Sequence, residues 1–271
     1  MNIPTITELP RKRLSYSQVS KYLRCPRQYA LSYIVKGEDR YSNEALVVGS
    51  VVHEAMADVI QERLNGRPPD DALDYGIATI REELPSRALA FPWSETAIDT
   101  IDKTVTLAIA CLLAWWEAFG KDTNAVAVEE ECRGEIGGVP CLAYIDLRRI
   151  LVTPSGPQVQ LVDYKVTGRA KPQTWVDDNL QMMMYAALTG VRDVALAFIQ
   201  KPTKNKPALF VLRETRITDE QLLHGENIVR DVNDAILKNS FPRREPGSWE
   251  CSQKYCDSYA TCRPPITPVT T

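Results

Sequence analysis

Apolar residues recur at helical spacing through the first 120 positions of the chain. Ser15 and Gln18 form a capping box at the start of a short helix, and Pro26 ends that helix. Because proline is well tolerated in a first helical turn, a second helix is predicted to begin at Pro26. Three longer helices are predicted over 44–64, near 72–84 and from Ser94 to Phe119.

The hydrophobic period changes from helical to extended after Gly120. Extended segments separated by a Gly137-Gly138 turn and a TPSGP turn predict a three-stranded meander. The pattern then predicts a helix, two strands joined by a TKNK turn, and a last helix capped by Thr218 with Gln221. The meander strands are 125–136, 139–152 and 158–166, and the later elements are a helix over 173–188, strands over 193–201 and 207–217, and a helix ending near Lys238.

This order of elements predicts an α/β fold with a mixed sheet at its centre. A chain of 271 residues, 44% of them hydrophobic, can bury one sizeable core. We therefore expect one compact unit with three parts. These are a helical N-terminal part over 1–120 that carries Cys25 and His53, a core over 121–240, and a cysteine-rich segment without periodicity over 241–271.

Composition narrows the kinds of protein that this chain encodes. A net charge of -3 excludes binding of nucleic acid by bulk electrostatics, so such binding would need local basic clusters or a bound metal. No apolar run reaches the roughly 18 residues that a membrane span requires, and the N-terminus lacks the apolar stretch of a signal peptide. We therefore expect a cytoplasmic protein with no membrane contact, in which seven cysteines favour free thiols or a metal site over disulfides.

The candidate chemistry lies in the strands of the meander. Asp163 and Lys165 are two positions apart in one strand, so their side chains leave the same face of the sheet. Such pairs also occur on ordinary exposed strands, but Asp146 interrupts an apolar run in the preceding strand. A buried carboxylate needs a partner or a metal, so Asp146 forms a salt bridge with Arg148 or Lys165, or it helps to bind a cation. Two carboxylates on neighbouring strands suit Mg²⁺ or Mn²⁺, beside which Lys165 would orient a water molecule or act as a base in phosphodiester hydrolysis.

The sequence LVDYKVTGR, which follows the strand with Asp146 and precedes the helical NLQMMMYAAL, resembles the RecB-like branch of the PD-(D/E)XK nuclease superfamily. The motifs of that branch occur here in the family's order. The resemblance implies a restriction-endonuclease-like core of order αβββαβ. It also implies that Asp146, Asp163 and Lys165 are catalytic residues of a metal-dependent nuclease.

Two further motifs of the branch fall on predicted helices. The resemblance implies a metal-ligating histidine on an upstream helix, and GSVVHEAMA supplies His53, whose ordinary alternative is a satisfied polar residue. The family's QxxxY motif matches Gln181 and Tyr185, which share one helical face and could equally pack that helix on the sheet. In the functional interpretation both side chains hydrogen-bond to a phosphate oxygen or to a ligating carboxylate.

Four cysteines form a second candidate site. Cys251, Cys256 and Cys262 lie within twelve residues, and Cys25, at the junction between two helices, is the best fourth thiol for a tetrahedral site. One N-terminal and three C-terminal cysteines resemble the iron-sulfur subset of the branch, which includes the CRISPR-associated RecB-like exonucleases and AddB-type nuclease domains. The family spacing would place a cysteine at Gln253, whereas this chain has Cys251. Four intervening residues are compatible with the cluster loops of other proteins, so a 4Fe-4S cluster is favoured, with structural zinc as the alternative. Apolar surroundings instead favour a packing role for the three remaining cysteines, Cys111, Cys132 and Cys141.

The resemblance implies a function in DNA metabolism. The expected activity is exonucleolytic cleavage of DNA ends or single strands in recombination, phage DNA metabolism or CRISPR adaptation, together with proteins of those pathways. One alternative is a protein that recognises DNA ends within a larger complex and cleaves weakly or not at all, and another is a zinc-stapled partner-binding protein. The intact set of Asp146, Asp163 and Lys165 favours the enzyme.

Overall fold

The computed structural model describes residues 2–35, 44–89, 97–253 and 255–263, so the predicted helix start at Ser94 lies outside the described residues. The chain forms two compact units. The first comprises residues 1–41, 133–143 and 223–271, and the second comprises residues 42–132 and 144–222. The three-part division expected from the sequence stays a prediction. The two units group residues that lie together in space, and this grouping does not show which segments of the sequence fold independently.

The predicted α/β fold with a mixed sheet is confirmed. The sheet has the strand order β1-β2-β3-β4-β5, in which β3 pairs parallel with β4 while β2–β3 and β4–β5 pair antiparallel. The strands are β1 (Ala125–Ile136), β2 (Val139–Thr153), β3 (Gly156–Thr167), β4 (Asp193–Gln200) and β5 (Leu209–Arg216). The helices are α1 (Tyr16–Arg24), α2 (Pro26–Tyr33), α3 (Glu44–Leu64), α4 (Pro69–Leu89), α5 (Ala97–Ala118), the 3₁₀ helix η1 (Gly120–Asp122), α6 (Gln173–Asp177), α7 (Leu180–Thr189), α8 (Asp219–Leu237) and α9 (Tyr259–Cys262).

The single helix predicted over 173–188 is wrong in one respect, because it is divided into α6 and α7. Asn179 interrupts it with an extended backbone conformation, and its side-chain oxygen accepts a hydrogen bond from the Met182 N–H. An asparagine in this position satisfies one of the amide groups that have no partner at the start of a helix, and so it begins a new helix. The break therefore separates α6 from α7 along the chain.

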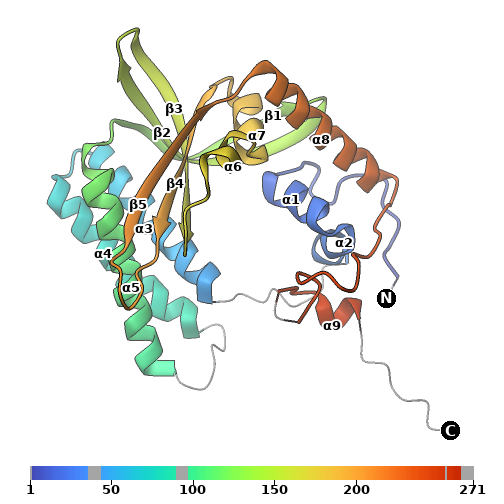
Figure 1. Ribbon diagram of the computed structural model, residues 1–271, viewed down its shortest axis with the longest axis horizontal. Coiled ribbons are helices and arrows are strands. Elements are labelled where there is room, and N and C mark those ends of the chain that lie inside the picture. Colours follow the sequence, from blue (N-terminus) through green and yellow to red (C-terminus); the bar gives the residue numbers. More distant parts are fainter. Residues whose placement is uncertain (1, 36–43, 90–96, 254, 264–271) are drawn as a thin grey trace. The chain divides into compact units, whose positions relative to one another are not determined.

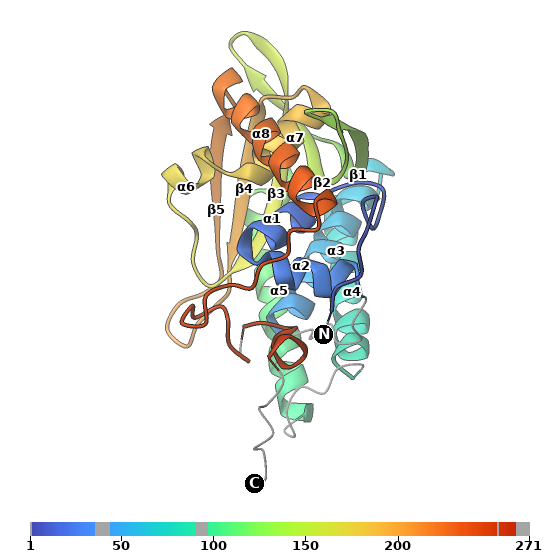
Figure 2. The same cartoon turned by 90° about the vertical axis from the view of Figure 1, so that its right-hand side faces the viewer.

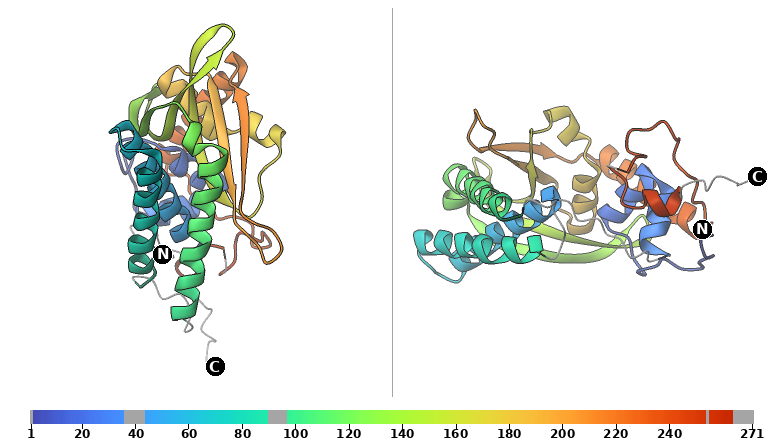
Figure 3. Two further views of the ribbon diagram at one scale, coloured as in Figure 1. Left: turned by 90° about the vertical axis from the view of Figure 1, so that its left-hand side faces the viewer. Right: turned by 90° about the horizontal axis from the view of Figure 1, so that it is seen from below.

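The sheet of the second unit is covered on both faces. Helices α3, α4 and α5 lie on one face, and α6 and α7 lie on the other, against β5 and β4 (Figure 1). Figure 3 shows the three long helices side by side. Val162 and Tyr164 of β3 point into the core under the long helices, together with Leu147, Ala197 and Trp115. Because side chains alternate along a strand, Asp163 and Lys165 point to the opposite face, as the sequence predicted.

The first unit joins the two ends of the described chain. Its C-terminal segment runs past α1 and α2 to α9 (Figure 2). Tyr22 donates its hydroxyl hydrogen to the Ser240 carbonyl, and the ring of Phe241 stacks on that of Tyr29. Gln28 Nε2 donates a hydrogen bond to Asp257 Oδ1 at 2.6 Å. Among the described residues, no helix combines the length and the apolar character needed to cross a membrane.

Gly76 sets how closely α4 approaches α3. A Cβ atom at this position would lie 2.9 Å from the carbonyl oxygen of Ala55 and would overlap the side chain of Val59. We expect Gly76→Ala to lower the free energy of unfolding by about 1–3 kcal/mol, because the overlap forces the helices apart. Gly49→Ala on α3 is the control, because nothing lies within 4 Å of its added Cβ. The control should raise stability by roughly 0.5–1 kcal/mol, as alanine does in a helix interior. Urea denaturation measures both changes, and equal effects would contradict the packing argument.

Candidate active site

Four elements of the second unit contribute the site residues predicted from the sequence. They lie far apart along the chain but come together where α3 and α7 meet β2 and β3. The structure brings together His53 of α3, Asp146 of β2, Asp163 and Lys165 of β3, and Gln181 and Tyr185 of α7.

Asp163 lies at the centre of this group and is only 2% exposed. Its Oδ1 accepts a hydrogen bond from Gln181 Nε2 at 2.6 Å, and the Tyr185 hydroxyl lies 3.1 Å from the same oxygen. Lys165 Nζ lies 2.7 Å from Asp163 Oδ2 and donates a hydrogen bond to Gln181 Oε1 at 2.9 Å. Since Gln181 and Tyr185 are one turn apart, a single face of α7 holds this carboxylate.

The Tyr185 hydroxyl completes a chain of hydrogen bonds. It accepts a hydrogen bond from Gln181 Nε2 at 2.7 Å and lies 2.9 Å from the carbonyl oxygen of Tyr144. Its single hydrogen can be donated either to that carbonyl or to Asp163. Burial is the main cause that raises the pKa of Tyr185, and the Asp163 carboxylate raises it further, so the phenol keeps its hydrogen.

Asp146 lies where the pairing of β2 with β3 ends. The last paired residues are Leu147 and Val162, and the next side chain, Asp146, accepts a hydrogen bond from the Tyr164 N–H at 2.7 Å. At this end of the β2–β3 pairing, the Asp146 carboxylate therefore accepts the hydrogen bond that a backbone carbonyl would accept within the sheet. A salt bridge of Asp146 with Arg148, one of the alternatives considered, is wrong, because Arg148 pairs with Glu130 at 2.7 Å.

Burial controls the protonation of Asp146 and His53. Desolvation and the neighbouring Asp163 raise the pKa of Asp146, while the Tyr164 N–H acts in the opposite direction. Burial lowers the pKa of His53 to about 4, so its imidazole is neutral near pH 7. Its Nδ1 lies 3.4 Å from Asp146 Oδ2. A neutral imidazole beside two carboxylates offers nitrogen and oxygen donors to a divalent cation.

His53, Asp146 and Lys165 border an open cleft of about 680 Å³ on the second unit. The cleft is also lined by three acidic residues that the sequence reasoning missed, Glu54, Asp58 and Glu129. Glu129 has a φ of 49°, a left-handed conformation that is uncommon for residues other than glycine. Burial and the nearby Asp163 raise its pKa. The sequence gives little signal for Glu129, because it is the first of three consecutive glutamates with no feature that sets it apart.

Asp163 Oδ2 provides the test of whether a divalent cation suits this site. This atom is buried, and within the described residues it has no hydrogen-bond donor, because its 2.7 Å contact with Lys165 lacks hydrogen-bond geometry. A buried carboxylate oxygen without a donor is a suitable ligand for a hard cation. In the part of the chain that the structure describes, no three His, Cys, Asp or Glu side chains surround one point closely enough to hold an ion. The donor chemistry thus fits Mg²⁺ or Mn²⁺, and ligand distances of about 2.0–2.1 Å for Mg²⁺ require these side chains to move toward the ion.

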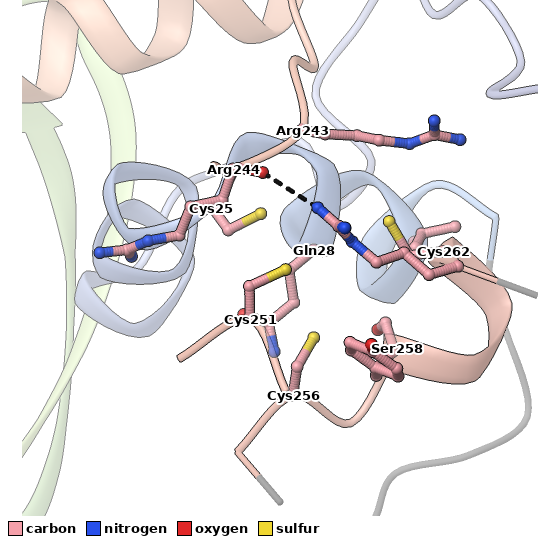
Figure 4. A pocket seen from close by; sticks show the side chains of 11 residues that line it. Cys25, Gln28, Arg243, Arg244, Cys251, Cys256, Ser258 and Cys262 are labelled. Atoms are coloured by element: carbon pink, nitrogen blue, oxygen red, sulfur yellow. Dashed lines mark hydrogen bonds between the residues drawn. The ribbon is translucent and has the colours of Figure 1, made fainter. Parts of the chain in front are cut away.

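The four cysteines predicted as a second site border one small pocket of the first unit (Figure 4). Cys25 reaches it from the junction of α1 and α2, and the other three come from the C-terminal segment. Burial is the main cause that raises the pKa of Cys256. Two of the remaining cysteines, Cys111 and Cys141, are buried, in keeping with a packing role. The four predicted thiols thus line one pocket from both ends of the described chain, although within the described residues no three of them lie close enough together to hold a metal ion.

Comparisons with known proteins agree with this architecture. A model of the PD-(D/E)XK nuclease superfamily matches residues 13–263. A segment of 55 residues, 20% of this chain, is 40% identical to one of the subunits of the ATP-dependent helicase/deoxyribonuclease from Carboxydothermus hydrogenoformans, and it spans only 5% of that relative's length. The crystal structure of a candidate exonuclease from Eubacterium rectale has a similar fold, with a TM-score of 0.56 and 14% sequence identity, covering 96% of this chain and 91% of that one.

The closeness of Asp146 to Asp163 should affect the thermal stability of the protein. Asp146→Asn keeps an oxygen for the Tyr164 N–H but removes one of two adjacent negative charges. Without metal, we therefore expect the variant to unfold at the same temperature as the parent chain or a few degrees higher. Excess Mn²⁺ should stabilise the parent chain, by about 2.7 kcal/mol at one hundred times the dissociation constant, and should stabilise Asp146→Asn much less.

Thermal unfolding with and without Mn²⁺ measures both effects. Asp102→Asn, an exposed position on α5, is the matched control and should respond to Mn²⁺ as the parent chain does. Equal stabilisation of all three proteins by Mn²⁺ would show that the ion does not bind at Asp146.

Proposed function

Because the chain belongs to the PD-(D/E)XK nuclease superfamily, we propose that it is a metal-dependent deoxyribonuclease whose active site is the cleft at Asp146, Asp163 and Lys165. One observation carries the proposal. Within the described residues, the buried Asp163 carboxylate has an oxygen without a hydrogen-bond donor, directly beside the Lys165 ammonium and close to a second carboxylate. Such oxygen ligands beside a cationic side chain suit metal-assisted hydrolysis of a phosphodiester.

Asp146, Asp163 and the neutral imidazole of His53 would hold Mg²⁺ or Mn²⁺. When bound, such an ion stabilises the negative charge that develops on the phosphate and acidifies a water molecule. His53 suits this role because burial keeps it unprotonated near pH 7. Asp146 is fixed by the Tyr164 N–H, so one of its oxygens is oriented before any ion arrives.

Lys165 would act on the water molecule or on the phosphate. Its Nζ is held between Asp163 Oδ2 and Gln181 Oε1, at the wall of the cleft. From there an N–H of the ammonium group can orient the attacking water or neutralise a phosphate oxygen. Gln181 and Tyr185 are positioning residues in this proposal, because they contact the Asp163 carboxylate and fix its orientation.

We further propose that the enzyme acts as an exonuclease on DNA ends or single strands. Support comes from the relatives, one described as a candidate exonuclease and the other as part of an ATP-dependent helicase/deoxyribonuclease. The second relative favours work within a larger complex, in recombination, phage DNA metabolism or CRISPR adaptation. Recognition of DNA ends without cleavage is the competing function, and the assay of cleavage decides between the two.

The four cysteines Cys25, Cys251, Cys256 and Cys262 are proposed to hold a 4Fe-4S cluster, with structural zinc as the alternative. The support is that all four border one pocket while the other cysteines do not. Four thiolates are the ligand set of such clusters. The described residues of the C-terminal segment, 241–253 and 255–263, have little regular structure beyond the short helix α9, so a cluster would stabilise them by attaching them to the junction of α1 and α2.

The cleavage assay uses end-labelled single-stranded and double-stranded DNA, with Mg²⁺, Mn²⁺ or EDTA. We expect cleavage only with the metal. Lys165→Ala should lower the rate at least about 100-fold, in the range of 10²–10⁴ typical for a lost general acid or base, while leaving stabilisation by Mn²⁺ intact. Lys103→Ala on the exposed side of α5 is the control and should keep the parent rate. DNA binding without cleavage by the parent chain would favour the end-recognition function instead.

The cluster proposal is tested on protein purified without oxygen. We expect about four irons per chain and a brown colour, as for a cluster held by four cysteines. Cys25→Ala should lose the iron and unfold at a lower temperature, because the C-terminal segment is then released. Cys132→Ala, whose thiol is outside the pocket, should retain both properties. A colourless protein with one zinc per chain would support the zinc alternative, and the absence of both metals would contradict any metal at these cysteines.

A further inference from the structure

A second concave surface of the second unit lies at the carboxyl ends of β3 and β4. It has a volume of about 590 Å³, and its polar lining comes from Arg169, Lys171, Gln200 and Arg213. Gln200 is the last residue of β4, which runs parallel to β3. In open α/β sheets, the crevice outside the carboxyl ends of parallel strands is the usual place for a ligand. The active-site cleft and this pocket have different lining residues.

The pocket is suited to an anion. Three of its side chains are cationic, and among the described residues that line it there is no carboxylate. The neighbouring Glu214 is engaged elsewhere, since its carboxylate accepts hydrogen bonds from Arg149 and Gln160. Arg213 Nε is buried and has no hydrogen-bond partner within the described part of the chain. A buried N–H without an acceptor is costly, and an anion in the pocket would supply that acceptor.

The pocket shares a face of the sheet with the catalytic residues. Arg213 is paired with Leu196, and Leu196 is paired with Asp163, so these three residues form one row across β5, β4 and β3. Along β3, Lys165 and Thr167 are successive residues on that face, roughly 7 Å apart at the rise of an extended strand. The Thr167 hydroxyl lies 3.4 Å from the Arg169 N–H and 3.3 Å from the Arg169 carbonyl, which orders the chain as it leaves β3. A polymer with regularly spaced phosphates can therefore contact Lys165 and the pocket at once.

An aromatic side chain adjoins the cations. Lys171 Nζ lies 5.7 Å from the ring centroid of Trp175, and this tryptophan of α6 is 41% exposed. Exposed aromatic rings beside basic groups are the usual means of binding single-stranded nucleic acid, in which a base stacks on the ring and cations contact the backbone.

We propose that this pocket binds a backbone phosphate of the DNA strand, next to the phosphate undergoing cleavage, and that Trp175 stacks on a base of the same strand. The inference rests on the proposed function, because it takes DNA to be the substrate. It adds a subsite in which Arg169, Lys171 and Arg213 contact the phosphate. The subsite lies beyond the carboxyl end of β3, so it fixes the direction in which the strand leaves the active site.

The test measures binding of a fluorescent single-stranded oligonucleotide to the full chain carrying Asp163→Asn, which prevents cleavage during the measurement. In this background, the pocket variant carries both Arg169→Ala and Lys171→Ala. It is compared with a control variant that carries both Arg81→Ala and Lys103→Ala. The control pair removes the same charges from exposed positions on α4 and α5. Fluorescence anisotropy is recorded over a series of salt concentrations.

The pocket variant should bind more weakly, and the magnitude of the slope of log K against log salt should fall by up to roughly 0.7, the value for one lost phosphate contact on a single strand. The control variant should show the same slope of log K against log salt as the Asp163→Asn protein without further changes. Trp175→Ala should weaken binding roughly five- to a hundredfold at constant slope, because stacking involves no ion release. Binding by the pocket variant that equals the control at every salt concentration would overturn the inference.

The outcomes separate this inference from the proposed function. If the parent chain cleaves DNA while the pocket variant binds as its control does, the subsite is absent and the nuclease assignment stands. If binding depends on the pocket but the parent chain never cleaves DNA, the nuclease assignment fails and the subsite stands. A chain that binds no DNA overturns both.

Discussion

A carboxylate buried in the middle of a sheet is the constraint around which the second unit is organised. Asp163 has almost no contact with solvent, and an ionised group there costs several kcal/mol unless the protein compensates it. The compensation comes from Lys165 on the same strand and from Gln181 and Tyr185 on α7. The position and rotation of α7 on the sheet therefore depend on the Asp163 carboxylate as well as on hydrophobic packing.

Compensation of this carboxylate is incomplete, and that is consistent with a site built for a ligand. One oxygen of Asp163 receives hydrogen bonds from α7, while the other, in the part of the chain that the structure describes, has only the ion pair with Lys165. Asp146 adds a second buried carboxyl group close by, and burial, together with the neighbouring Asp163 carboxylate, raises the pKa of Asp146. Both features reduce the stability of the metal-free protein. Proteins retain such costs mainly at functional sites.

Much of this arrangement could be predicted from the sequence because it depends on local periodicity. The period of two along β3 predicted that Asp163 and Lys165 leave the same face of the sheet, and their contact with each other agrees with this. The helical period placed Gln181 and Tyr185 together for the same reason. The resemblance to the nuclease family added His53, which no local pattern would have selected from an otherwise ordinary helix.

Features that depend on the pairing of distant strands could not be predicted. The choice of Glu130 as the partner of Arg148 depends on the register between β1 and β2, and a single sequence does not reveal that register. Glu129 lines the cleft and has a left-handed backbone conformation that an L-residue rarely adopts, which a single sequence does not reveal. Arg213 belongs to the basic pocket only because β5 pairs with β4 and β4 with β3. The division of one helix into α6 and α7 was missed because Asn179 also fits a helix interior, although less well than a cap.

The parallel pairing of β3 with β4 has a consequence for the order in which the chain becomes active. A ribosome delivers His53, Asp146, Asp163 and Lys165 before α7 and β4 are complete, and parallel strands cannot pair until the segment between them has folded. Until then Gln181 and Tyr185 have no fixed place, and the Asp163 carboxylate is free to be hydrated. Because the orientation of the Asp163 carboxylate depends on α7 and on the pairing of β3 with β4, a chain that ends before β4 lacks the geometry on which the proposed cleavage activity depends.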